Sequence, residues 1–183
     1  HGTRGTTLTQ ISNKLELTKT SLYYYVKTKE ELVYQCYLST CIEMQGMLDK
    51  AITQDGLAIT KLEYIFRQNF DSWNDIIDGN RGHLAALTEI GALSAKHISS
   101  ISEYYKGFVG QIINLIKEGQ ADGSMQNVDP AKTSIAIWGT LFWLPVWISE
   151  VEPKDREHAF TQWMTIIKSG LHHSNNSFSF KNL

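Results

Sequence analysis

The sequence contains few of the residues that define disulfide-rich, proline-rich or membrane-spanning proteins. Only two of its 183 residues are cysteine and only three are proline. Cys36 and Cys41 stand five positions apart on a predicted helix, so they point away from each other and form neither a metal-ligand pair nor a disulfide framework. The most apolar stretch, residues 135–148, is shorter than the roughly 20 residues that a membrane span needs. It predicts a buried helix, and the composition predicts a globular, cytoplasmic protein.

Charge of one sign is concentrated at one end of the chain. The whole sequence has 17 basic and 19 acidic residues, a net charge of −2. Residues 1–29 hold five basic side chains and one acidic one, a net +4, which leaves −6 for the remainder. A basic end on an acidic body is typical of a protein that contacts a polyanion at that end, with a chance distribution as the alternative.

Helical periodicity runs through most of the chain. Apolar residues recur at steps of three and four, and no stretch alternates for long enough to predict a strand. Glycine-rich breaks at residues 78–80 and 119–123 separate these series. Pro130 and Pro153 stand where the first turn of a helix accepts proline. The sequence therefore predicts an all-α fold.

Three helix starts follow one another within the first thirty residues. Thr7 and Gln10 have the spacing of a capping box, and Thr18 is suited to cap a second helix. Residues 28–31, Thr-Lys-Glu-Glu, form another capping box that opens a longer helix. The pattern predicts two short helices that share a small apolar core, joined by a tight turn and followed by a connecting helix.

The second short helix carries side chains suited to DNA. Lys19, Thr20 and Ser21 fill its first turn, where a lysine, hydroxyls and backbone N–H groups suit phosphate oxygens. Three tyrosines follow at residues 23–25. A helix pair of this size can insert its second helix into the DNA major groove. From the pattern alone, a helical hairpin with exposed tyrosines is the alternative.

The segments TTLTQIS at residues 6–12 and LTKTSLYYYVKTKEEL at residues 17–32 resemble the DNA-binding signature of TetR-family transcriptional regulators. The resemblance implies an all-α protein with an N-terminal helix-turn-helix DNA-binding domain, followed by a larger helical ligand-binding and dimerisation domain. Residues 1–45 would form the first domain, including the start of the connecting helix, and residues 46–183 the second.

The chain departs from the family pattern in its turn, its recognition helix and its beginning. Glu16 replaces the glycine usual in the turn, where a left-handed backbone costs about 1 kcal/mol or more for other residues. Tyr25 and Val26 stand where the family has histidine and phenylalanine, so operator preference is not transferable. Family members place a further helix before the one at Thr7. Because the chain begins at His1 without a leader, we expect part of its N-terminus to be missing or disordered.

The resemblance implies a DNA surface on the helix-turn-helix. Thr20 is expected to contact a base, and Tyr24 and Tyr25 to contact bases and backbone. The expected phosphate contacts are Lys19, Tyr23 and Lys29. Such regulators bind near-palindromic sites on double-stranded DNA as two-fold dimers. The complete set of expected DNA-binding residues is Thr7, Thr18, Lys19, Thr20, Ser21, Tyr23, Tyr24, Tyr25 and Lys29.

The resemblance also places a homodimer interface on the last two long helices, near residues 130–150 and 153–172. Any of the apolar residues there could equally belong to the core of a single chain. The candidates for the interface are Ile137, Leu141, Leu144, Trp163, Ile166 and Ile167.

The family further implies a small effector bound in the helical body, which shifts the two recognition helices and lowers DNA affinity. Aromatic side chains could wall an apolar cavity for a hydrophobic or amphipathic effector. The segment 138–147 faintly resembles family regulators that respond to acyl-CoA, which makes an acyl-CoA-like molecule one candidate. The polar end of such an effector could meet Arg67, Asn69, Glu89 or His97. A purely structural core is the alternative for the aromatic residues. The candidates for the pocket are Phe66, Phe70, Trp73, Tyr104, Phe108, Trp138 and Phe142.

Together these features predict a DNA-binding repressor that an effector releases. No nucleophile elbow, phosphate-binding glycine loop or His-Glu-x-x-His motif supports an enzyme, and we expect no cofactor or metal. A helical interaction module that has lost sequence-specific DNA binding is the alternative function, with Glu16 as its main support.

Overall fold

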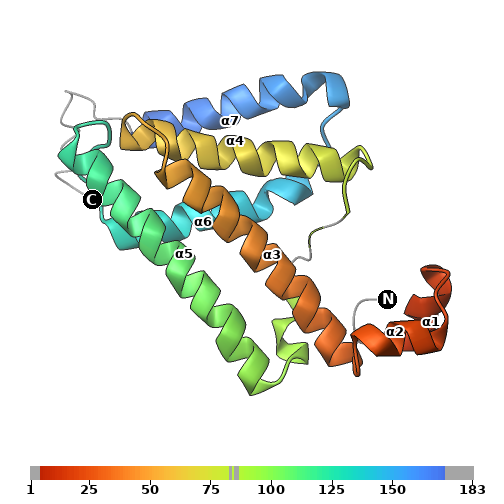
Figure 1. The fold of residues 1–183 in the computed structure, drawn as a ribbon. Helices are drawn as coiled ribbons and strands as arrows, with labels where there is room; N and C mark the ends of the chain where they lie inside the picture. Colours follow the sequence, from red (N-terminus) through yellow and green to blue (C-terminus); the bar gives the residue numbers. More distant parts are fainter. Residues whose placement is uncertain (1–4, 83, 85–86, 172–183) are drawn as a thin grey trace, which may run out of the picture. The chain divides into compact units, whose positions relative to one another are not determined.

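The computed structural model describes residues 5–82, 84 and 87–171, without the side chains of residues 87–89. The expected additional segment before the first helix and the side chain of Glu89 lie outside this part. The described residues form helices and connecting turns and contain no strand (Figure 1), which confirms the all-α prediction. The elements are α1 (Leu8–Lys14), α2 (Lys19–Tyr25), α3 (Lys29–Ile52), α4 (Ala58–Ile77), η1 (Leu87–Ala92), α5 (Ala95–Ala121), α6 (Pro130–Ile148), η2 (Pro153–Asp155) and α7 (Arg156–Leu171).

The described part of the chain divides into two compact units. The first unit combines residues 1–45 with residues 83–106, and the second combines residues 46–82 with residues 107–183. Within the first unit, η1 and the first turns of α5 bury apolar side chains against α3. The division into a DNA-binding domain of residues 1–45 and a larger domain of residues 46–183 stays a prediction.

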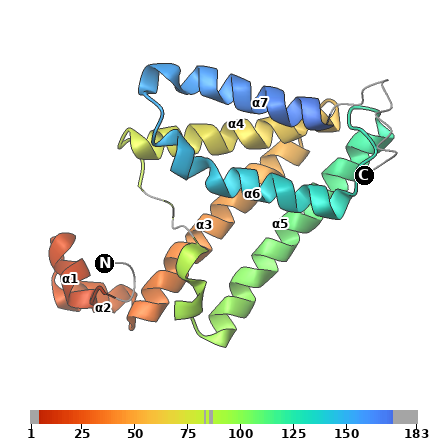
Figure 2. The same cartoon turned by 180° about the vertical axis from the view of Figure 1, so that it is seen from behind.

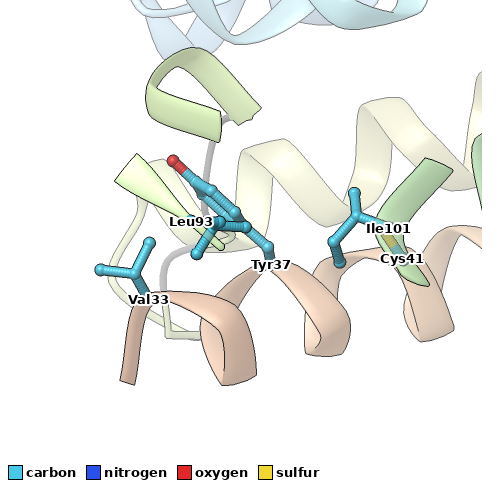
Figure 3. Close-up of a cluster of buried hydrophobic side chains, with 5 residues drawn as sticks. All are labelled: Val33, Tyr37, Cys41, Leu93 and Ile101. Carbon is cyan, nitrogen blue, oxygen red and sulfur yellow. The ribbon is translucent and has the colours of Figure 1, made fainter. Parts of the chain in front are cut away.

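The packing of α3 against α5 forms a small core of its own. Tyr37 reaches toward Leu93, and Cys41 lies next to Ile101 (Figure 3). Together with Val33 these side chains are at most 9% exposed. Burial of this size contributes roughly 1.5–3 kcal/mol for each large apolar side chain. The start of α3 therefore has a firm support within the first unit.

In the second unit, α4 packs against both α6 and α7, and both views show α4 and α7 side by side (Figures 1 and 2). The buried face of α4 includes four residues that recur at helical spacing: Leu62, Ile65, Phe66 and Phe70. Phe66 and Phe70 are fully buried.

The start of α4 is capped from the far end of α5. Its own N-cap residue, Leu57, makes no side-chain cap hydrogen bond. The Ala58 N–H donates instead to Asp122 Oδ2 over 2.8 Å, and the Ile59 N–H donates to Ser124 Oγ over 3.3 Å. These bonds satisfy two of the backbone donors that every helix leaves free at its start.

The same connecting segment also serves α6 and α7. Asp129 caps α6 by accepting from the backbone N–H groups of Ala131 and Lys132, with Pro130 in the first turn as predicted. The Gln126 N–H donates to the Leu171 carbonyl over 2.8 Å at the end of α7. Residues 122–129, named here the capping segment, thus satisfy backbone groups at the ends of three helices.

Helix α6 is buried on one side and exposed along the other, so the prediction of a buried helix for residues 135–148 holds for one side alone. Ile137, Leu144 and Ile148 are buried, whereas Ile135 and Trp143 are more than half exposed. The helix is apolar all round, and one chain covers only one side of it. Over the described residues, no helix combines the length and apolar character needed to cross a membrane.

Candidate DNA-binding site

Helix α1 begins at the predicted capping box. The Gln10 N–H donates to Thr7 Oγ1 over 3.2 Å, and the Thr7 N–H donates to Gln10 Oε1 over 2.8 Å. The box satisfies backbone donors at both positions, which fixes where the helix starts. Thr7 is exposed but uses its hydroxyl within this box.

The turn between α1 and α2 has the left-handed backbone that its position in the motif demands. Glu16 has φ = 55°, and it is the one residue other than glycine with positive φ among those that the structure describes. The Leu17 N–H closes the turn by donating to the Ser12 carbonyl over 2.9 Å. The expectation for Glu16 is confirmed, and the residue bears the steric cost of this conformation.

Helix α2 starts at Thr18, as the sequence predicts. The Ser21 N–H donates to Thr18 Oγ1 over 3.0 Å, and the two hydroxyls lie 2.7 Å apart. Leu22 and Val26 turn inward and pack with Leu8 of α1 into the core of the helix pair. This packing determines which face of α2 points outward.

The outward face of α2 carries two large aromatic side chains. Tyr24 and Tyr25 are 80% and 76% exposed, and their rings meet edge to face at 5.3 Å. Lys19 and Thr20 are exposed in the first turn. Tyr23 is half-buried against the core, with the Lys19 ammonium 5.7 Å from its ring centre. Aromatic, hydroxyl and cationic groups thus share one face of the helix, a composition suited to phosphates and base edges.

The start of α3 is joined to the start of α5 by a cluster of polar side chains. Glu30 Oε1 accepts from the Ser94 N–H and lies 2.8 Å from His97 Nδ1. His97 Nε2 lies 3.8 Å from Glu31 Oε2, and the ring stacks on Tyr34 at 4.0 Å. Hydrogen bonds from Ser94, and then His97, hold the pKa of the Glu30 carboxyl below its usual value. We call Glu30, Glu31, Tyr34, Ser94 and His97 the α3–α5 clasp.

Two of the residues proposed to anchor an effector have partners within the protein. His97 belongs to the α3–α5 clasp. Arg67 donates to both carboxylate oxygens of Glu157, at 2.8 and 2.7 Å, and pairs with Asp71. The Glu157 bond raises the pKa of the Arg67 guanidinium and lowers that of Glu157. Asn69 is 5% exposed, and its Oδ1 is buried without a hydrogen-bond partner.

The candidate effector residues pack mostly as core. Phe66 meets Trp163 at 4.8 Å and Phe70 meets Phe160 at 4.7 Å. These contacts favour the core interpretation for Phe66 and Phe70 over a pocket wall. Of the remaining candidates, Trp73 is half-buried on α4 and Phe142 is 38% exposed. Tyr104 packs on the core of the first unit. The rings of Phe108 and Trp138 meet at a centroid distance of 4.8 Å.

Two hollows of the second unit lie away from these candidate aromatic residues. One, of about 390 Å³, lies between α6 and α7 and is lined by residues that include Thr133, Ala136 and Ile166. The other, of about 400 Å³, is lined by residues that include Tyr64 and Arg67. Neither is lined by any of the seven aromatic residues that the sequence suggested for a pocket. The described residues contain no group of three or more His, Cys, Asp or Glu side chains able to hold a metal ion.

The predicted dimer residues divide into inward and outward groups. Ile137, Leu141 and Leu144 are at most 3% exposed within a single chain, so the prediction that they form the surface for a partner is corrected. Ile166 is 70% exposed and Ile167 is half-buried at the groove between α6 and α7. Trp163 packs against Phe66, Phe160 and Trp147 inside the second unit.

A family model for the tetracyclin repressor-like C-terminal domain matches residues 67–170, more than half of the chain. This segment does not overlap residues 6–32, whose motifs resemble the DNA-binding signature of the same family. The chain therefore belongs to the TetR family of transcriptional regulators. Membership of a family of DNA-binding regulators also confirms that the chain is not an enzyme.

Solved structures of similar regulators share the fold over almost the whole chain. A ketosteroid transcriptional regulator of Mycobacterium tuberculosis is 16% identical, with a TM-score of 0.74 over 95% of this chain and 88% of its own. A tetR-family regulatory protein from Rhodococcus RHA1 is 18% identical, with a TM-score of 0.75 over 95% and 90%. AibR, in complex with isovaleryl coenzyme A and operator DNA, is 18% identical, with a TM-score of 0.71 over 90% and 88%. No curated protein sequence matches the chain. The likeness establishes the shared fold.

Proposed function

We propose that the protein is a cytoplasmic repressor that binds a palindromic operator as a homodimer and leaves it when a small effector binds. The observation that carries the proposal is the outward face of α2. A helix of seven residues exposes two tyrosines, a lysine and a threonine while its other side is buried in the helix pair. Such a face has little use in a free protein and matches what the DNA major groove offers.

Within this interface we assign different tasks to the side chains. Thr20 is exposed in the first turn, and no hydrogen bond engages its hydroxyl among those of the described residues, so we assign it to a base edge. The hydroxyls of Thr7, Thr18 and Ser21 already hold helix starts, so these three residues position the backbone N–H groups at the helix ends for phosphates. Lys19 and Lys29 supply charge, and Tyr23, Tyr24 and Tyr25 supply contact area along the groove.

Replacement of Thr20 and Lys29 by alanine separates sequence reading from charge. Lys29→Ala is expected to weaken binding similarly on all sequences and to reduce the slope of log affinity against log salt by about one. Thr20→Ala is expected to relax the preference at one base pair in each half-site, a change of about 1–3 kcal/mol in discrimination. The measurement is selection of bound fragments from a random duplex pool at two salt concentrations, followed by titration of single sites.

Recovery of a palindromic motif from this selection would support a dimeric sequence reader. Recovery of only random, salt-sensitive fragments would contradict the proposal and favour a helical module without sequence reading. An equal, sequence-independent loss for both variants would contradict the separate roles of Thr20 and Lys29.

We propose a hydrophobic or amphipathic effector, of which an acyl-CoA thioester is the first candidate. Two facts support it: AibR has been solved with isovaleryl coenzyme A and operator DNA, and Asn69 presents an unpaired buried carbonyl oxygen on the apolar face of α4. An unsatisfied buried acceptor costs about 1–3 kcal/mol, which a donor on a ligand would recover. Isovaleryl coenzyme A added to the operator complex is the probe. Release of the selected DNA supports this effector class, and unchanged binding at saturating thioester contradicts it.

We further propose that the dimer forms on the exposed side of α6 and the groove beside α7. Ile135, Trp143 and Val146 recur on one face of α6 and remain 48–60% exposed. Ile166 both lines the groove of about 390 Å³ and protrudes from α7. A side chain that borders its own groove can enter the same groove of a second copy, as a two-fold interface requires.

A further inference from the structure

His97 lies between two carboxylates at the point where α5 meets the start of α3. Its Nδ1 is 2.8 Å from Glu30 Oε1, and its Nε2 is 3.8 Å from Glu31 Oε2. A neutral imidazole carries a proton on only one ring nitrogen and presents a lone pair at the other. Only the imidazolium, which has a proton on both nitrogens, suits a carboxylate on each side.

The surroundings of the ring keep it in this geometry. Tyr34 stacks on it with an interplanar angle of 9°, and the Tyr34 hydroxyl lies 3.0 Å from Ser100 Oγ on α5. The titratable groups that face the imidazole from α3 are the carboxyls of Glu30 and Glu31 and the phenol of Tyr34. On the η1 side, Ile90 and Leu93 belong to the adjoining apolar cluster. Lys96, the neighbouring cation on α5, is exposed.

The clasp acts on the part of α3 that follows the recognition helix directly. Helix α2 ends at Tyr25 and α3 begins at Lys29, so three residues separate them. Leu32 in the first turn of α3 packs on the core formed by Leu22 and Val26. A first turn of α3 that is held firmly therefore also holds the orientation of α2.

We propose that His97 is a positioning residue for DNA recognition and that it acts fully only when it is protonated. This inference rests on the proposed DNA-binding function. Protonation adds a positive charge and a second N–H to the ring, so that the imidazolium attracts both carboxylates, which tightens α5 against α3. A pre-organised helix pair loses less freedom on binding DNA, so its affinity for the operator is higher at mildly acidic pH. His97 and the two carboxylates thus form a site for one proton, and operator affinity changes with the fraction of molecules in which this site holds its proton.

The test is operator affinity at about pH 6 and about pH 8, the range in which histidine changes charge, at constant salt. The wild-type chain is expected to bind about fivefold more tightly at the lower pH, a typical coupling between two sites. His97→Gln is expected to reduce this dependence to within about twofold. The matched control is His158→Gln on α7, an exposed histidine that is expected to leave the wild-type dependence intact. A His97→Gln variant that keeps the full pH dependence, or a wild-type chain without one, overturns the proposal.

Two further measurements keep the result decisive. Glu31→Gln retains the Glu30 bond to Ser94 but removes the second carboxylate, so it is expected to lower the pH dependence even if His97→Gln folds poorly. In the DNA-free protein, ¹⁵N spectra at about pH 6 are expected to show protons on both ring nitrogens of His97. An unprotonated Nε2 there overturns the proton site. Protonated nitrogens without operator binding at either pH would instead contradict the proposed function and leave the proton site standing.

Discussion

Glu16 and His97 show what can be predicted for a single residue. The left-handed backbone at Glu16 follows from its place in a short local motif, so the sequence was sufficient to predict it. From the sequence, His97 is one of four polar residues that could meet the polar end of an effector. Its actual partner, Glu30, is 67 positions away, and no local spacing connects the two. Residue roles within a turn are therefore predictable, whereas roles that depend on a distant partner are not.

At Glu16, replacement by glycine is expected to stabilise the helix pair. A left-handed conformation costs an L-residue about 1–2 kcal/mol, and glycine avoids this cost. Glycine also has greater conformational freedom in the unfolded chain, which lowers the stability of the fold by about 0.5–1 kcal/mol. The net effect is a stabilisation of about 0.5–1 kcal/mol. Slower hydrogen exchange of the α1 and α2 amides measures it. Glu16→Gln keeps the side-chain size and the backbone strain, so it serves as the control. Faster exchange in the glycine variant would show that the Glu16 side chain stabilises the turn.

At the scale of helices, starts with local caps were predicted correctly and starts with distant caps were not. Each of three helices carries its start signal at its own first residues: Thr7 for α1, Thr18 for α2 and Pro130 for α6. Helix α4 has only Leu57 at its N-cap position, and its capping groups come from Asp122 and Ser124, more than sixty residues later. The sequence predicts the body of this helix from its apolar spacing but offers no signal for how it is capped.

Removal of the Asp122 carboxylate is expected to destabilise the second unit. Asp122→Ala should lower the free energy of unfolding by about 1 kcal/mol, as the loss of a helix cap does. Burial raises the pKa of the Asp122 carboxyl, but hydrogen bonds from Ser124 and the Ala58 N–H lower it by more. Because the folded pKa lies below the unfolded one, this stabilisation is complete above the unfolded value of about 3.9 and is lost as the pH falls through the folded value.

Urea unfolding at neutral and acidic pH measures this effect. The difference between the wild type and Asp122→Ala should shrink as the pH drops below about 4. Asp75→Ala, at an exposed site on α4, is the control and should change stability by less than about 0.5 kcal/mol. A difference that stays constant into acid would show that the charge of Asp122 contributes nothing to the cap.

At the scale of the whole molecule, the sequence predicted the fold class but not which side of α6 faces outward. Apolar residues surround this helix, so its spacing gives no preferred inner face. By spacing alone, the apolar set Ile137, Leu141 and Leu144 is as suitable for a partner as the set Ile135, Trp143 and Val146. Only the packing of α4 against α6 separates the two groups. A helix apolar on every side is itself a sign that a second surface covers it.

Because Trp143 lies on this exposed side of α6, it is a better residue than Trp163 for testing the dimer. Trp143→Asp is expected to weaken association by about 2 kcal/mol or more, roughly 30-fold, because exposed aromatic residues often carry interface energy. Trp163→Asp would instead damage the aromatic core around Phe66 and Phe160. Sedimentation equilibrium measures the change. Ile42→Asp, which alters an exposed apolar residue on α3, is the control. An unchanged dimer mass for Trp143→Asp would place the interface elsewhere.

The capping segment also determines how the second unit opens. Residues 122–129 satisfy backbone groups at the starts of α4 and α6 and at the end of α7, so displacement of the segment frees all three ends together. The ends of these helices are therefore coupled in local unfolding, and their amides become accessible in one cooperative event rather than by separate fraying. Anything that displaces the segment, such as a protease or a bound molecule, loosens three helices at once.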